Sequence, residues 1–95
     1  MSQASMQGAI PITVTADAVV SAVPCRLIGA VLHHTATTTL VLYDNASAAS
    51  GTAAINMRCA ANDQAEVFFG DEGINCANGV YADWTAGVAT VYIKK

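Results

Sequence analysis

Apolar and polar residues alternate along the chain in short runs bounded by turn residues, a pattern typical of β-strands. Residues 18–22 are ambiguous between a helical turn and an extended segment, and residues 74–77 form a short, irregular run. No segment keeps a 3.6-residue period over the length of a helix. The clearest strand-like runs lie at 12–15, 25–34, 38–43, 53–58, 65–69, 80–84 and 88–93. The pattern predicts an all-β fold, a single antiparallel β-sandwich or jelly-roll-like domain of seven to eight short strands.

Two local signals refine this prediction. The β-rich runs Val80–Trp84 and Val88–Ile93 flank Thr85-Ala86-Gly87, so we expect them to pair as a hairpin with a bulged turn. Gly29 interrupts a long strand-like run, which predicts a bulge or a close backbone approach at that position.

The length of 95 residues allows one domain. The beginning of the chain is small and polar, and the first alternating run opens at Pro11. We therefore expect a flexible N-terminal arm over residues 1–10 and a β-sandwich domain over residues 11–95.

The composition is unusually apolar for such a small domain. Hydrophobic residues make up 54%, charged residues only 12%, and the mean hydropathy is +0.43, whereas an average soluble domain is about a quarter charged. In Leu27–Leu32 and Leu40–Leu42 both alternating faces are apolar, which indicates a second sheet on one side and a partner subunit on the other. The sequence therefore predicts burial against other protein chains.

Two classes of partner are not expected. The longest apolar stretches are interrupted by Arg26, the two histidines and Asp44, so no run of about 20 apolar residues can span a membrane. No secretory signal is visible at the start. The net charge is −3, with only two arginines and two lysines, which is too little clustered positive charge to bind DNA or RNA.

Candidate chemistry is sparse. His33 and His34 are adjacent on a strand and point to opposite faces, so we expect one rim histidine and one packing histidine, with no shared metal. Asp71 and Glu72 lie between two glycines and are interpreted as solvated turn acids. No C-x-x-C pair is formed by the three cysteines, Cys25, Cys59 and Cys76. We interpret them as buried core thiols, in keeping with folding in a reducing cytosol. We expect no catalytic, cofactor-binding or metal-binding residue.

Other residues are interpreted as structural. Asn45 matches a glycosylation sequon, but we interpret it as a turn residue, and Asn62-Asp63 also marks a turn. The aromatic residues on the strands are expected to anchor the core or an interface. The candidate interface residues are Ile10, Ile12, Trp84 and Tyr92.

The second half of the chain resembles the small structural virion proteins of tailed bacteriophages. The resemblance is carried by Phe69-Gly70, by the run from Gly73 to Asp83 (GINCANGVYAD), and by Gly87-Val88-Ala89-Thr90-Val91-Tyr92. Upstream, the runs RLIGAVL from Arg26 and TLVLYD from Thr39 are similar to the same layout. Residues 1–24 lie outside the resemblance.

The resemblance implies a non-enzymatic capsid decoration (cement) protein, a β-sandwich homotrimer that binds the major capsid protein on the outer surface of the head. Assembly would take place in the host bacterial cytoplasm. The arm could add a strand to a capsid sheet edge, so its deletion is expected to weaken capsid binding. A tail, fibre or baseplate module remains an alternative, as does a small hydrolytic or carbohydrate-active domain.

Overall fold

The computed structural model describes residues 9–34, 36–70 and 72–94. It contains nine strands, which are β1 (Ile10–Val14), β2 (Ala18–Ser21), β3 (Cys25–His34), β4 (Thr38–Tyr43), β5 (Ala53–Cys59), β6 (Asp63–Phe68), β7 (Ile74–Cys76), β8 (Val80–Trp84) and β9 (Val88–Lys94). The predicted all-β class is confirmed. The two additional strands are β2 and β7, which arise from the segments that the sequence left ambiguous or irregular.

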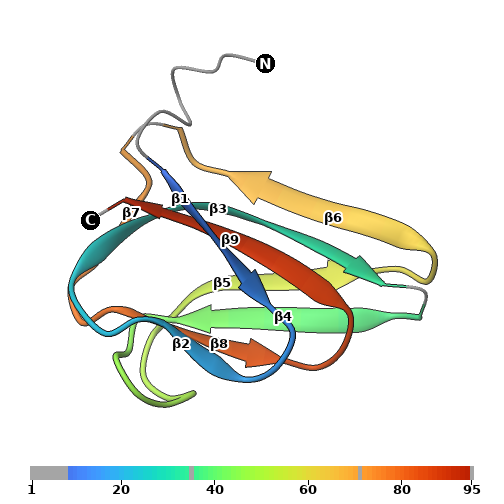
Figure 1. The fold of residues 1–95 in the computed structure, drawn as a ribbon, viewed down its shortest axis with the longest axis horizontal. Coiled ribbons are helices and arrows are strands. Elements are labelled where there is room, and N and C mark those ends of the chain that lie inside the picture. Colours follow the sequence, from blue (N-terminus) through green and yellow to red (C-terminus); the bar gives the residue numbers. More distant parts are fainter. Residues whose placement is uncertain (1–8, 35, 71, 95) are drawn as a thin grey trace.

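The strands form two antiparallel sheets that pack face to face (Figure 1). Sheet A has the order β1-β9-β3-β6, and β7 also pairs with β3; sheet B has the order β2-β8-β4-β5. Four strand pairs follow one another as in a single long hairpin, in which each pair encloses the next along the chain: β1·β9, β2·β8, β3·β6 and β4·β5. That hairpin is folded over so that β1, β3, β6 and β9 lie in sheet A and β2, β4, β5 and β8 lie in sheet B, which is the topology of a jelly roll.

The core lies between the two sheets and follows directly from the two-residue period of the strands. In β4, β5 and β9 every second side chain points inward and is buried, whereas the intervening ones are half-buried or exposed. The largest fully buried side chains include Leu27, Leu32, Leu40, Leu42 and Ile93.

The predicted hairpin of residues 80–93 is wrong. β8 pairs with β2 and β4 in sheet B, whereas β9 pairs with β1 and β3 in sheet A. The connection through Gly87, which has a φ of 86°, therefore arches from one sheet to the other. Both strands bury apolar side chains, and each obtains more burial in the middle of its own sheet than a local hairpin could give it.

The arch is fixed by hydrogen bonds of side chains from β8, from β4 and from the loop between β1 and β2. The indole Nε1 of Trp84 donates to the carbonyl oxygen of Gly87 at 2.8 Å, and the buried hydroxyl of Thr38 donates to the carbonyl oxygen of Ala86 at 3.0 Å. The carboxylate of Asp17 accepts from the backbone N–H of Trp84 at 2.8 Å. These contacts satisfy backbone groups that a hairpin ladder would otherwise have paired.

Gly29 occupies the irregular position that the sequence predicted. The pairing of β3 with β9 shifts between Leu27 and Gly29, so that Ile28 is an extra, bulged residue. On the other edge of β3, β7 pairs with residues 25–27 and β6 with residues 29–34, and Ile28 lies between the two. A bulge and a close approach are thus both present at this site.

The apolar pattern on both faces of β3 has a partial explanation within the chain. Ile28 is only 1% exposed but lies outside the main core cluster. Its carbonyl oxygen accepts the N–H of Phe69 at 2.9 Å, and its side chain lies close to Gly73. The chain itself therefore covers Ile28, whereas the outward-pointing Val31 and Val41 remain half-buried.

Candidate functional site

The outer face of sheet A carries a row of aromatic side chains that begins over Gly29. Phe68 and Tyr92 lie directly opposite Gly29 on the two neighbouring strands, and Pro11 lies opposite Tyr92. We call these four residues, Phe68, Gly29, Tyr92 and Pro11, the aromatic row. The rings of Phe68 and Tyr92 have centroids 5.7 Å apart and planes tilted by 46°, a favourable geometry for an aromatic pair.

The absence of a side chain at Gly29 makes this arrangement possible. A Cβ atom at Gly29 would lie 2.4 Å from Cδ1 of Phe68 and 2.4 Å from the carbonyl oxygen of Val67. The Phe68 ring therefore lies close to the glycine backbone, where it covers the strand but remains 41% exposed. Such packing of an aromatic ring over a cross-strand glycine fixes the register of β3 and β6.

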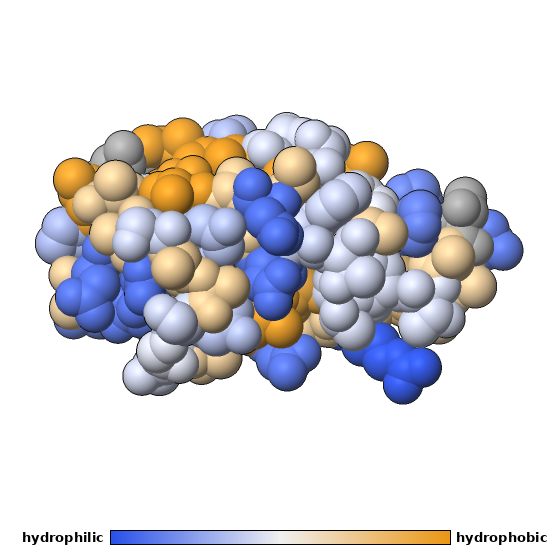
Figure 2. Space-filling model, turned by 90° about the horizontal axis from the view of Figure 1, so that it is seen from below, coloured by the Kyte–Doolittle hydropathy of each residue, from blue (hydrophilic) through white to orange (hydrophobic). Residues whose placement is uncertain are grey.

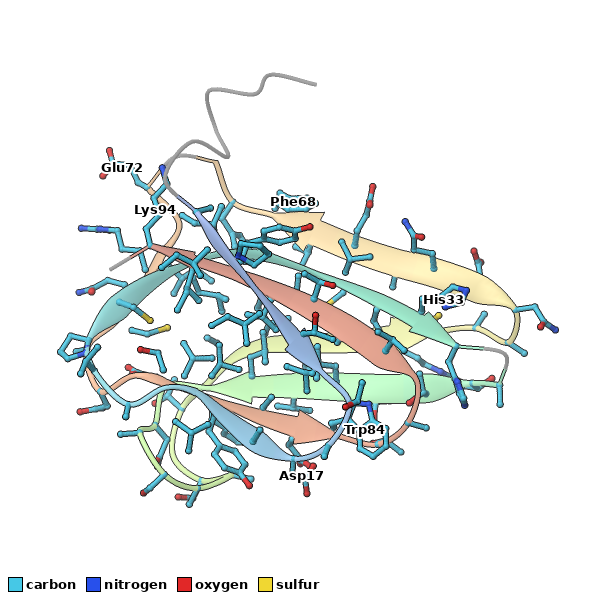
Figure 3. The ribbon with its side chains drawn as sticks, in the orientation of Figure 1. Asp17, His33, Phe68, Glu72, Trp84 and Lys94 are labelled. Carbon is cyan, nitrogen blue, oxygen red and sulfur yellow. The ribbon has the colours of Figure 1, made fainter. Side chains whose placement is uncertain are left out.

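Further apolar side chains lie at the same end of sheet A. Phe69 follows Phe68 in the chain and is 38% exposed, and Ile10 precedes Pro11 and is 43% exposed. In Figure 3, Phe68 lies on the same side of the molecule as Lys94 and Glu72, whereas His33 lies toward the opposite end. The space-filling view from the β2–β8 side shows the surface from a different direction, and strongly hydrophobic residues gather mainly at its upper left (Figure 2).

Charged residues flank the aromatic row on both sides. The next row toward the chain's C-terminus pairs Arg26 with Lys94 and Asn75. The next row in the other direction pairs Val31 with Glu66 and with Thr90. One side of the aromatic row is therefore basic, and the other carries a carboxylate.

The basic side also contains a pocket. The pocket has a volume of about 340 Å³ and is lined by Pro24, Cys25, Arg26, Asn75 and Lys94. The guanidinium of Arg26 donates to the backbone carbonyl of Glu72 at 3.2 Å, which holds the arginine beside the pocket. Two cationic side chains and an amide at an open pocket favour an anionic occupant.

The outer face of sheet B has a different character. Val19 is 44% exposed and lies opposite Tyr81, which in turn lies opposite Tyr43. Both tyrosines are half-buried. Farther along, Val41 has Asp83 and Asn56 as its cross-strand neighbours, so polar side chains interrupt the apolar surface.

The four predicted interface residues fall into two groups. Ile12 and Trp84 are partly buried and pack against the core. Ile10 lies exposed at the start of β1, and Tyr92 lies half-buried in the aromatic row. These two surface candidates both lie on sheet A but on opposite faces, because Ile10 is the direct partner of the buried Ile93 and Tyr92 is the partner of Pro11. Phe68, which the sequence offered only as a general anchor, lies beside Tyr92 on the outer face.

The two histidines lie as the alternation predicted. His33 is exposed on the outer face of sheet A, opposite Gln64 and Val88. His34 is half-buried, and its side chain lies against the backbone of Gly87, where a Cβ atom would be 2.7 Å from the histidine Cβ. They do not share a site.

Acidic and amide side chains mainly organise turns. Asn45 accepts hydrogen bonds at its Oδ1 from the N–H groups of Ser47 and Ala48 at 2.8 and 3.0 Å, and its amide donates to Ser50, so the predicted turn role is confirmed. Asp44 accepts from the N–H of Asn78 at 2.9 Å. Asp71 lies outside the described residues, and Glu72 is exposed.

The turn functions of Asp17 and Asp44 were not predicted. Their position directly after or before a strand was the signal that could have indicated them. Within residues 9–34, 36–70 and 72–94, no group of three or more histidine, cysteine or acidic side chains is arranged to hold a metal ion. In the same part of the chain, no helix is long and apolar enough to cross a membrane.

All three cysteines are buried and reduced, as predicted. The structure adds a relation that their spacing in the sequence conceals: Cys25 and Cys76 are direct cross-strand partners on β3 and β7. Burial, with smaller contributions from Cys25 and Asp44, raises the pKa of the Cys76 thiol to about 11. Cys59 is separate, and its thiol donates to the carbonyl oxygen of Asp63 at 3.0 Å.

The fold and the surface define an all-β sandwich with an exposed aromatic row and a neighbouring basic pocket. The chain matches no protein-family model, no curated protein and no solved structure.

Proposed function

We propose that this chain is a non-enzymatic structural protein of a bacteriophage virion, a decoration protein that binds the outer surface of the head as a homo-oligomer. The observation that carries the proposal is the aromatic row, a partly solvent-exposed apolar surface on the outer face of sheet A. Apolar surface of this kind marks interfaces in soluble proteins. The resemblance of the second half of the chain to small virion proteins supplies the location.

The charges beside the aromatic row favour a second copy of this chain as its partner. Arg26 and Lys94 flank one side of the row and Glu66 flanks the other. A copy that presents the same face in the opposite direction would bring its basic side over the acidic side of the first copy. Charge complementarity of this kind selects the partner and fixes its orientation.

Attachment to the head is proposed to involve the N-terminal arm, with the major capsid protein as partner. The position of β1 determines which deletion can test this attachment without damage to the fold. Ile10 already belongs to β1, where it pairs with Ile93, so removal of residues 1–10 would damage sheet A. Removal of residues 1–8 leaves β1 complete and is the cleaner variant.

The first experiment measures the mass of the purified chain in solution by light scattering. We expect an oligomer for the wild type and a shift toward monomer for Phe68→Ser. Val19→Ser is the matched control, because Val19 is 44% exposed on sheet B and Phe68 is 41% exposed on sheet A. A mass of two chains favours paired faces and a mass of three favours a ring. A stable wild-type monomer contradicts the proposal.

The second experiment measures binding to tail-less heads of the phage whose genome carries this reading frame. The full chain is expected to decorate the heads, and the chain lacking residues 1–8 is expected to bind more weakly with an unchanged circular dichroism spectrum. Inhibition of phage adsorption by the purified domain, without head binding, would instead place the protein in the tail.

A further inference from the structure

Cys25 and Cys76 lie at facing positions on β3 and β7 that a disulfide can bridge. They are directly opposite each other on the antiparallel strands β3 and β7, and directly opposite residues project to the same face of a sheet. Opposed Cα atoms in such a ladder lie about 4.5 or 5.5 Å apart. Both values fall within the range of about 4.4–6.8 Å that a disulfide requires, so the register of β3 and β7 is compatible with this bond.

The two thiols differ in access. Cys25 is 5% exposed and lines the basic pocket, whereas Cys76 is fully buried. The pocket places Arg26 and Lys94 next to Cys25, and both side chains attract anions. A small peptide disulfide with a net negative charge, such as glutathione disulfide, fits a pocket that Cys25 lines together with Arg26 and Lys94.

We propose that Cys25 and Cys76 form a disulfide when the protein meets a small anionic disulfide, with Cys25 as the entry thiol and Cys76 as the resolving thiol. The inference does not depend on the proposed function. For any protein made in a reducing cytosol and later released into an oxidising medium, the bond would fasten β7 to β3 after folding is complete.

The chemistry takes two exchange steps. The Cys25 thiolate attacks one sulfur of glutathione disulfide, forms a mixed disulfide, and releases one glutathione, which takes up the proton lost by Cys25. Cys76 then loses its proton, displaces the second glutathione from Cys25, and closes the protein disulfide. Two electrons and two protons pass from the protein to the oxidant, which leaves as two molecules of glutathione.

The second step carries a pH signature. Because the pKa of Cys76 is raised to about 11, only a small fraction of this thiol is ionised near neutral pH. The rate of ring closure should therefore rise about tenfold for each pH unit between pH 7 and 10. The rate of disulfide formation between thiols in an unfolded chain would level off near the ordinary thiol pKa of 9.0.

The experiment incubates the folded protein with glutathione disulfide and follows its mass. We expect the wild type to lose two hydrogens. Cleavage after basic residues and after glutamates places the three cysteines on separate peptides, so the bond can be assigned directly to Cys25 and Cys76. Oxidation should raise the temperature of half-unfolding by roughly 10 °C, because the bond closes a loop of about 50 residues.

Three single variants separate the functions of the thiols. Cys59→Ser should form the same bond as the wild type. Cys76→Ser should stop at the mixed disulfide, with one glutathione on Cys25, and Cys25→Ser should remain unmodified. The inference is overturned if the folded wild type keeps its mass while the urea-unfolded chain is oxidised. It is equally overturned if the assigned bond involves Cys59; this wild-type result stands even where a variant fails to fold.

Discussion

The two outer faces of the sandwich are made from the same residue types but differ in what they leave exposed. On sheet A a glycine in the middle of β3 lets Phe68 and Tyr92 meet across three strands, and the resulting aromatic row stays open to solvent. On sheet B the half-buried tyrosines Tyr43 and Tyr81 are cross-strand partners, and the next row along the sheet places Asp83 and Asn56 beside Val41. The absence of a side chain at Gly29 therefore distinguishes the outer face of sheet A from that of sheet B.

The two sheets also differ in how their ends are held in place. Near sheet B, the connection between β8 and β9 is held by hydrogen bonds of the side chains of Asp17, Thr38 and Trp84. Sheet A instead carries the additional strand β7, which pairs only with residues 25–27 of β3. Polar contacts thus secure the end of sheet B near Trp84, whereas the pairing of β7 with β3 and the packing of Phe68 over Gly29 secure the opposite end of sheet A.

The largest effect is expected from a side chain at Gly29. Gly29→Val should lower the free energy of unfolding by about 3 kcal/mol, because the new atoms overlap the Phe68 ring and the immovable carbonyl of Val67. Gly70→Ala is the control: Gly70 has a φ of 85° and nothing near a built Cβ, so it should lose only about 1 kcal/mol. Urea unfolding measures both, and equal losses would refute the close approach.

The buried thiol of β7 gives the next largest effect, and it depends on pH. The pKa of Cys76 is about 11 in the folded chain against an ordinary value of 9.0. Between these values the unfolded chain releases a proton that the folded chain keeps, so stability falls as the pH rises from 9 to 11. Under reducing conditions, the free energy of unfolding of Cys76→Ala should therefore decrease by up to about 2 kcal/mol less than that of the wild type over this pH range.

The control for that measurement is another truncation in the core. Val80 is also fully buried but has no titratable group, so Val80→Ala should be destabilised by a similar amount at every pH and keep the wild-type slope. Parallel curves for Cys76→Ala and the wild type would show that the thiol does not titrate differently on folding.

Periodicity in the sequence was sufficient to predict the fold class, because side chains alternate between core and solvent in almost every strand. It failed at the partner of β8. The run from Val80 to Ile93 has the local sequence pattern of a hairpin. Which strands pair in two stacked sheets, however, depends on contacts between residues far apart in the chain, and a short stretch of sequence does not reveal them. Gly29 shows the opposite case, since an isolated glycine in a strand has few explanations and the predicted one was correct.

The candidate site was predictable only in part. The opposed histidines follow from alternation, and Tyr92 was named as a surface anchor. The pairing of Cys25 with Cys76 could not be predicted, because the two residues are far apart in the chain and β7 is only three residues long. The same holds for Phe68 over Gly29. Both relations require the register of β3, which is set by the bulge at Ile28.

The smallest expected effect tests the polar closure of sheet B against the aromatic row of sheet A. Trp84→Phe removes the donor at 2.8 Å from the carbonyl of Gly87 and should cost about 1 kcal/mol, because that carbonyl loses its partner in a partly buried site. Tyr92→Phe keeps the ring that contacts Phe68 and should change stability by less than about 0.5 kcal/mol. Both are measured by thermal unfolding followed with circular dichroism. A larger loss for Tyr92→Phe would mean that its hydroxyl, and not its ring, holds the row together.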